Sequence, residues 1–100
     1  MTTISIELTK AAATLANALI ASNTKQGYSD YIATRNALLA ITTSEDFHRI
    51  EDASKGIIDC KQGTYDKFFR YNRNDDGSAY DAGWQYQNTT TQNDSVNFIG

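Results

Sequence analysis

Residues 4–21 read ISIELTKAAATLANALIA, and this stretch decides the fold class more firmly than any other part of the chain. Ile4, Leu8, Ala11 and Leu15 recur at alternating steps of four and three residues. Residues at these spacings share one face of an α-helix, and alanine is the strongest helix former. The pattern predicts a helix whose alanine-rich face lets a second helix approach closely, either in the core or in a self-association interface.

Two further helices are expected downstream. The first begins at Lys25 or Ser29 and ends at Ile41, where β-branched and polar residues follow. The second begins with Thr43 as its N-cap and stops at Gly63, because glycine readily adopts the left-handed backbone that ends helices. Its apolar stripe consists of Phe47, Ile50, Ala53, Ile57 and Ile58.

The aromatic residues gather in the next part of the chain. Seven of the eleven lie between Thr64 and Gln87. Thr64 is suited to cap a short helix over Tyr65–Tyr71, and the composition of residues 72–78 is that of a loop.

The sequence period changes near the C-terminus. Trp84 and Tyr86 alternate with glutamines, and Val96 and Phe98 flank an asparagine, which is the alternation typical of strands. The chain is therefore expected to form one mainly helical α+β domain over residues 1–100. It would have a three-helix core, a short fourth helix and a C-terminal β-hairpin or extended segment around Asn88–Asp94.

Composition limits the possible compartment and chemistry. Hydrophobic residues make up 40% of the chain, as in globular domains, yet no apolar run approaches the ~20 residues that cross a bilayer. The N-terminus lacks the pattern of a secretory signal, and Cys60 has no cysteine partner, so a cytoplasmic location is expected. One cysteine and His48, the single histidine, cannot complete a zinc site, and no cofactor is predicted.

Two chemical motifs are incomplete. Residues 72–77, NRNDDG, resemble the start of a calcium-binding loop, but Asn72 replaces the first aspartate and Gly83 occupies the position of the bidentate glutamate. His48 and Cys60 are twelve residues apart, about 18 Å along one helix, and cannot pair as base and nucleophile. We therefore predict no metal site, no catalytic residues and no enzymatic activity.

The charge distribution points to a protein partner. The net charge of −3 argues against direct binding to nucleic acid, and residues 74–100 carry four aspartates without a lysine or arginine. Aromatic and arginine side chains beside carboxylates are typical of protein-binding surfaces. The predicted contact residues of this segment are Arg70, Tyr71, Asp75, Asp76, Tyr80, Asp81 and Trp84. The third helix adds the carboxylates of Glu45, Asp46, Glu51 and Asp52. The alternative is that the aromatic segment simply closes the core.

A short, proline-free, mildly acidic chain without a catalytic motif resembles the small phage- or prophage-encoded anti-defence proteins, especially anti-CRISPR proteins. This resemblance of type implies stoichiometric inhibition of a host nucleic-acid-binding effector complex in the host cytoplasm, with carboxylates standing in for phosphates as in a DNA mimic. The second hypothesis is a structural module that self-associates, as a homodimer, through the alanine-rich first helix. A small enzyme ranks third.

Overall fold

The computed structural model describes residues 6–73 and 77–99, with side chains as far as residue 90. This part of the chain is mainly helical, as expected, and it contains no strand as far as residue 90. Its elements are α1 (Ile6–Ile20), a 3₁₀ turn η1 (Ala21–Asn23), α2 (Lys25–Ile41), α3 (Ser44–Gln62), α4 (Lys67–Tyr71) and α5 (Ser78–Ile99).

Local capping chemistry fixes the helix boundaries in the first two thirds of the chain. The Thr43 hydroxyl accepts a hydrogen bond at 3.1 Å from the backbone N–H of Asp46 and caps α3, as predicted. Gly63 ends α3 with a φ of 74°, which also confirms the prediction. Of the two starts predicted for α2, the earlier is observed, because Thr24 accepts a hydrogen bond at 2.9 Å from the N–H of Gly27.

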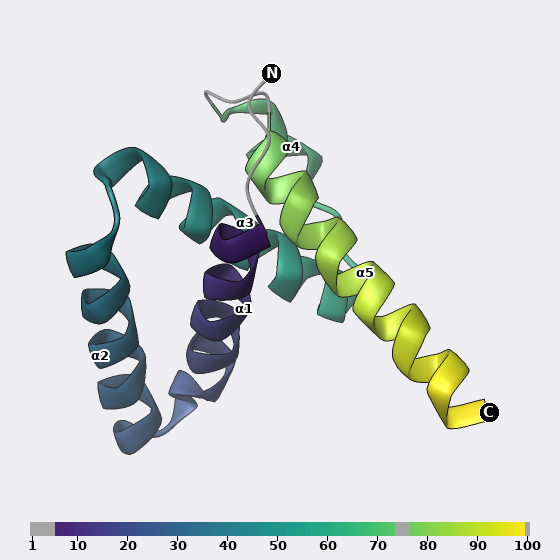
Figure 1. Ribbon diagram of the computed structural model, residues 1–100, viewed down its shortest axis with the longest axis horizontal. Helices are drawn as coiled ribbons and strands as arrows, with labels where there is room; N and C mark the ends of the chain where they lie inside the picture. Colours follow the sequence, from purple (N-terminus) through teal and green to yellow (C-terminus); the bar gives the residue numbers. More distant parts are fainter. Residues whose placement is uncertain (1–5, 74–76, 100) are drawn as a thin grey trace.

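Helix α3 lies at the centre of the fold, with α1 packed on one side and α5 on another (Figure 1). From α1, Ala12, Leu15 and Ala16 are buried against the apolar stripe of α3. The stripe residues in this cluster are Ile50, Ala53 and Ile57. Because Ala12 and Ala16 are completely buried, the alanine-rich face of α1 serves the core and is not available for the self-association expected from the sequence.

Two glycines bring α3 and α5 almost into backbone contact. A Cβ atom added at Gly56 would lie 2.1 Å from the carbonyl oxygen of Tyr80, and one added at Gly83 would lie 1.9 Å from that of Ala53. Glycine costs about 1 kcal/mol relative to alanine inside a helix. Here it permits an approach that any larger residue would block.

Helix α2 covers the outer side of α1 and contributes little to the core. All 17 of its residues are described and none is buried. Tyr31 and Leu38 pack partly on the core cluster. By contrast, 57% of Tyr28, 44% of Leu39 and 80% of Ile41 remain exposed.

The strand expected at Trp84–Gln87 is wrong, because these residues lie inside α5. Trp84 turns toward Tyr65 while Tyr86 packs on the core cluster, so the two rings serve different neighbours around one helix. Gly83 packs directly on Ala53 of α3, and this contact favours a helix here despite the two-residue alternation of the sequence. The second strand of the expected hairpin, at Val96–Phe98, lies beyond residue 90, where no side chain is described, and it stays a prediction.

Candidate functional site

Helix α4 and the turn before it form the candidate site. The predicted cap was Thr64, but the helix begins at Lys67 because the Asp66 carboxylate accepts a hydrogen bond at 2.9 Å from the N–H of Phe69. The backbone N–H of Phe69 and the ammonium of Lys55 hold the pKa of the Asp66 carboxyl below its usual range. The start of α4 is thus set by a carboxylate that is ionised at neutral pH.

A buried hydroxyl anchors the turn to the two central helices. Tyr80 of α5 is completely buried, and its hydroxyl donates to the Asp59 carboxylate at 2.8 Å. The same oxygen accepts a hydrogen bond at 2.7 Å from the N–H of Asp66. Lys55 joins both carboxylates, at 2.9 Å from Asp59 and 3.2 Å from Asp66.

Both the tyrosine and the lysine of this network are shifted in pKa. Burial raises the pKa of the Tyr80 hydroxyl, so it stays a hydrogen-bond donor. Burial alone would lower the pKa of Lys55, but its hydrogen bonds to Asp59 and Asp66 outweigh that effect and raise it. The network therefore keeps one cation between two carboxylates at neutral pH.

Two further ion pairs hold the rest of α4. The Arg70 guanidinium donates to the Asp81 carboxylate at 2.7 Å, and the Tyr65 hydroxyl donates to the same carboxylate. The Arg73 guanidinium donates to Asp52 of α3 at 3.0 Å. The segment that contains α4 is thus tied to the middle of α3 at both ends, through Lys55 and Asp52, and to α5 through Asp81.

Four aromatic rings pack near these ion pairs, those of Tyr65, Phe69, Tyr80 and Trp84. Tyr65 meets Trp84 edge-on at 5.0 Å between ring centroids, and it meets Tyr80 edge-on at 5.3 Å. The Phe69 ring lies 4.8 Å from the guanidinium carbon of Arg73. Such contacts add about 0.5–1.5 kcal/mol each beyond the area they bury. Of these rings Tyr80 is buried and Phe69 and Trp84 are half-buried, so part of the aromatic segment packs inside the domain, as the alternative interpretation expected.

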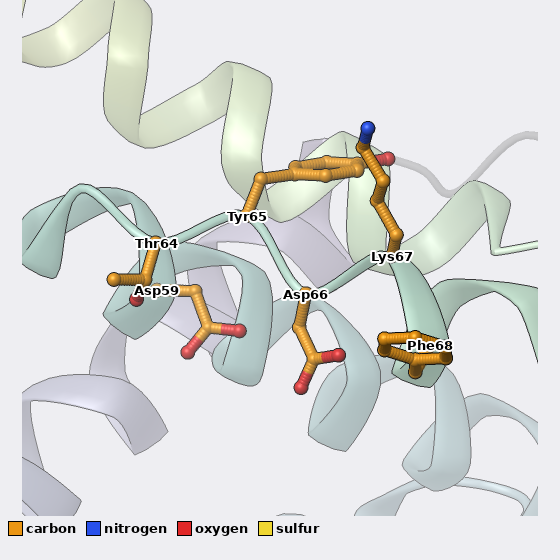
Figure 2. Close-up of a pocket in the computed structure, with 6 residues that line it drawn as sticks. All are labelled: Asp59, Thr64, Tyr65, Asp66, Lys67 and Phe68. Atoms are coloured by element: carbon orange, nitrogen blue, oxygen red, sulfur yellow. The ribbon is translucent and has the colours of Figure 1, made fainter.

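The other two aromatic side chains of α4, Phe68 and Tyr71, point into solvent. Phe68 is 84% exposed and Tyr71 is 87% exposed, although both belong to a helix that is fixed from its inner side. Figure 2 shows Phe68 at the edge of a shallow hollow of about 330 Å³. In this view the Asp59 and Asp66 carboxylates point to one side, and the Lys67 ammonium points to the other.

The structure places several predicted contact residues in the interior. Tyr80 and Asp52 are buried, whereas Asp81 and Arg70 pair with each other and stay partly exposed. Trp84 is half-buried behind Tyr65. Tyr71 is exposed as a contact residue should be, whereas Asp75 and Asp76 lie outside the described residues.

The predicted carboxylates of α3 stay on the surface but apart from α4. Glu45 and Asp46 both pair with Arg49, at 2.7 and 3.1 Å. They precede Asp52 by about two helical turns, roughly 10 Å along the axis. Glu51 lies 3.9 Å from Arg35, on the side of α3 that faces α2. These carboxylates are largely balanced by cations of the same chain.

Sequence reasoning missed Phe68 as an exposed residue. Adjacent residues differ by about 100° around a helix, so a helix of little more than one turn cannot bury both Phe68 and Phe69. That geometric signal was present in the sequence.

Comparisons with known proteins leave the site to be judged by its geometry. No family model, no curated protein and no solved structure matches this chain. Among the described residues, no group of three histidine, cysteine, aspartate or glutamate side chains could hold a metal ion. None of the described helices is long and apolar enough to cross a membrane.

Proposed function

We propose that this protein is a non-enzymatic inhibitor that binds a host nucleic-acid-binding effector complex, of the CRISPR type, in the host cytoplasm. The observation that supports a binding role is the exposure of Phe68 and Tyr71 on a helix whose inner side is fixed by charged hydrogen bonds. Rigid aromatic side chains lose little entropy when they bind, and they are enriched among residues that dominate binding energy.

The contact surface differs from the acidic surface expected from the sequence. Its centre is the aromatic pair on α4, and the paired carboxylates of Asp52 and Asp81 are excluded from it. The acidic contribution rests on Asp75 and Asp76, which follow α4 in the sequence. Complementary charge would steer this surface toward a basic groove, while the aromatic rings would supply most of the affinity.

Inhibition of purified effector complexes tests the proposal. A panel of CRISPR effector ribonucleoproteins is assayed for cleavage of target DNA with increasing amounts of this protein. We expect one panel member to lose activity near equimolar inhibitor. The double variant Phe68→Ser/Tyr71→Ser should raise the half-inhibitory concentration at least tenfold, which corresponds to about 1.4 kcal/mol.

Matched variants separate the contact from folding. Ile41→Ser removes an equally exposed apolar residue from α2, 80% exposed, and should inhibit like the wild type. Asp75→Lys/Asp76→Lys should weaken inhibition most at low salt. The proposed contact surface is refuted if the α4 double variant inhibits normally, and the proposed partner class is refuted if no effector complex is inhibited.

A further inference from the structure

A hollow of about 280 Å³ lies where α1, α2 and α3 meet. Its apolar walls are formed by Leu15 and Leu19 of α1, Tyr31 of α2 and Ile58 of α3. Leu15 is buried, whereas Leu19 is 40% exposed, so the hollow opens to solvent beside Leu19. A cavity of about 150 Å³ is large enough for benzene. The hollow therefore has room for one ring and a short chain attached to it.

A buried hydroxyl without a hydrogen-bond partner lines this hollow. Ser54 of α3 is 3% exposed, and no described group hydrogen bonds to its side chain. Every described side-chain nitrogen or oxygen atom that is sealed from solvent does have a partner. The Ser54 hydroxyl is therefore not sealed, and the hollow is the space from which it is reached. Because buried hydroxyls are usually satisfied, this one favours a ligand that can hydrogen bond to it.

The carboxylate of Glu51 adds a negative charge to the same hollow. Glu51 precedes Ser54 by three residues, so both side chains lie on one side of α3. No group in the described part of the chain donates a hydrogen bond to this carboxylate. Its ion-pair partners are distant, Arg35 at 3.9 Å and His48 at 3.5 Å, compared with about 2.7–2.9 Å for a charge-assisted hydrogen bond. Glu51 can therefore accept a hydrogen bond from a ligand.

The other charged residues of the lining are already paired. Lys55 and Asp59 lie 2.9 Å apart, and Lys55 also reaches Asp66 at 3.2 Å. Among its lining residues the hollow thus offers two hydrogen-bond acceptors, one of them charged, and no unpaired cation. Charge complementarity favours a positively charged ligand and disfavours an anion.

We infer that this hollow is a binding site for a small amphipathic amine, in which a short chain joins one apolar ring to a protonated amino group. The ring would contact Leu15, Tyr31 and Ile58. The ammonium group, which has three donors and no acceptor, would donate to the Ser54 hydroxyl and to the Glu51 carboxylate. None of these residues belongs to α4, so the site does not depend on the function proposed above.

Titration of the ¹⁵N-labelled full chain with 2-phenylethylamine, followed by two-dimensional NMR, tests the inference. We expect saturable shifts at the amides of Leu15, Leu19, Ser54 and Ile58, with a Kd on the order of 0.1–1 mM for so small a ligand. 2-Phenylethanol has nearly the same shape without the charge, and it should bind about fivefold more weakly. The anion 3-phenylpropanoate should bind more weakly still.

A fourth probe separates a free amine from a lysine side chain of a partner protein. n-Butylamine carries the same charge as 2-phenylethylamine but has no ring. It should bind about tenfold more weakly, because it leaves most of the apolar wall uncovered. Equal binding of the two amines would overturn the assignment of a ring-bearing ligand.

Three variants assign the contacts to residues. Glu51→Gln keeps the size of the side chain and removes its charge, so it should weaken 2-phenylethylamine about tenfold and leave 2-phenylethanol unchanged. Ser54→Ala should weaken both ligands about fivefold. Glu45→Gln is the matched control, because it removes a carboxylate that is 76% exposed on the same helix and does not line the hollow. It should change neither affinity.

Circular dichroism should show that each variant keeps its helix content and melting temperature. If Ser54→Ala fails to fold, the half-exposed Glu51 still decides the question. The absence of saturable shifts up to about 10 mM 2-phenylethylamine overturns the inference. So does a Glu51→Gln variant that binds the amine as tightly as Glu45→Gln does, or equal binding of the amine and 3-phenylpropanoate.

Discussion

Replacing Gly83 by alanine should destabilise the protein, although alanine is the better helix former. The added Cβ would lie 1.9 Å from the carbonyl oxygen of Ala53, whereas an ordinary contact begins at 3.4 Å. The obstacle is backbone, which cannot rotate away, so α5 would have to move about 1.5 Å from α3. A radial gap of even 0.5–1 Å forfeits a quarter to a half of each van der Waals contact.

The net effect follows from two opposed terms. Overpacking of this kind costs about 3 kcal/mol, and the better helix propensity of alanine returns about 1 kcal/mol. A net loss of about 2 kcal/mol lowers the melting temperature of a 100-residue domain by roughly 8–16 °C. Thermal unfolding followed by far-UV circular dichroism measures this shift.

A control and a double variant make the test specific. Gln85→Ala, at an exposed position of the same helix, should change stability by no more than about 0.5 kcal/mol. Gly56→Ala should behave like Gly83→Ala, and the double variant should lose less than the sum, because one displacement of α5 relieves both clashes. If Gly83→Ala instead raises the melting temperature by about 4–8 °C, helix propensity alone is acting, and the close crossing of α3 and α5 is wrong.

Two other predictions concern the network below α4. Tyr80→Phe should lower stability by about 1–3 kcal/mol in urea unfolding, because it leaves the N–H of Asp66 without its acceptor and removes one of the two donors to the Asp59 oxygen that Lys55 also contacts; an unchanged midpoint would contradict the hydrogen bonds. Since the pKa of Asp66 is lowered on folding, the stability that it contributes is present above its unfolded pKa of about 4 and is lost as the pH falls below that value. Asp66→Asn should flatten this acid limb of the stability profile, and a variant as acid-sensitive as the wild type would show that other carboxylates control it.

The helix boundaries set by local chemistry could be predicted from the sequence. Thr43 and Gly63 determine the ends of α3 through hydrogen bonds and backbone geometry that involve only neighbouring residues. Such local signals can be recognised in the sequence alone. The error at Trp84–Gln87 has a different origin. Helix formation there depends on Gly83 meeting Ala53, a contact between residues thirty positions apart, which no local period records.

The candidate site was predicted less well than the fold for the same reason. The aromatic segment was located, but the sequence could not say that Asp52 meets Arg73 or that Asp81 meets Arg70. These pairs join residues 21 and 11 positions apart, and in them both carboxylates bind an arginine of the same chain. Charge counted along a chain gives the sign of a region but not the direction in which each side chain points.

The central position of α3 also constrains how the protein is made. As the chain leaves the ribosome, α1 emerges before α3 and can cover the first apolar side of α3. The side around Gly56 must wait for α5, which is synthesised later. Until α5 is made, the side of α3 that carries Ala53 and Gly56 is exposed to solvent. Exposed surface of this kind makes an incomplete chain prone to aggregation. A chain interrupted before Gly83 would leave this side of α3 uncovered.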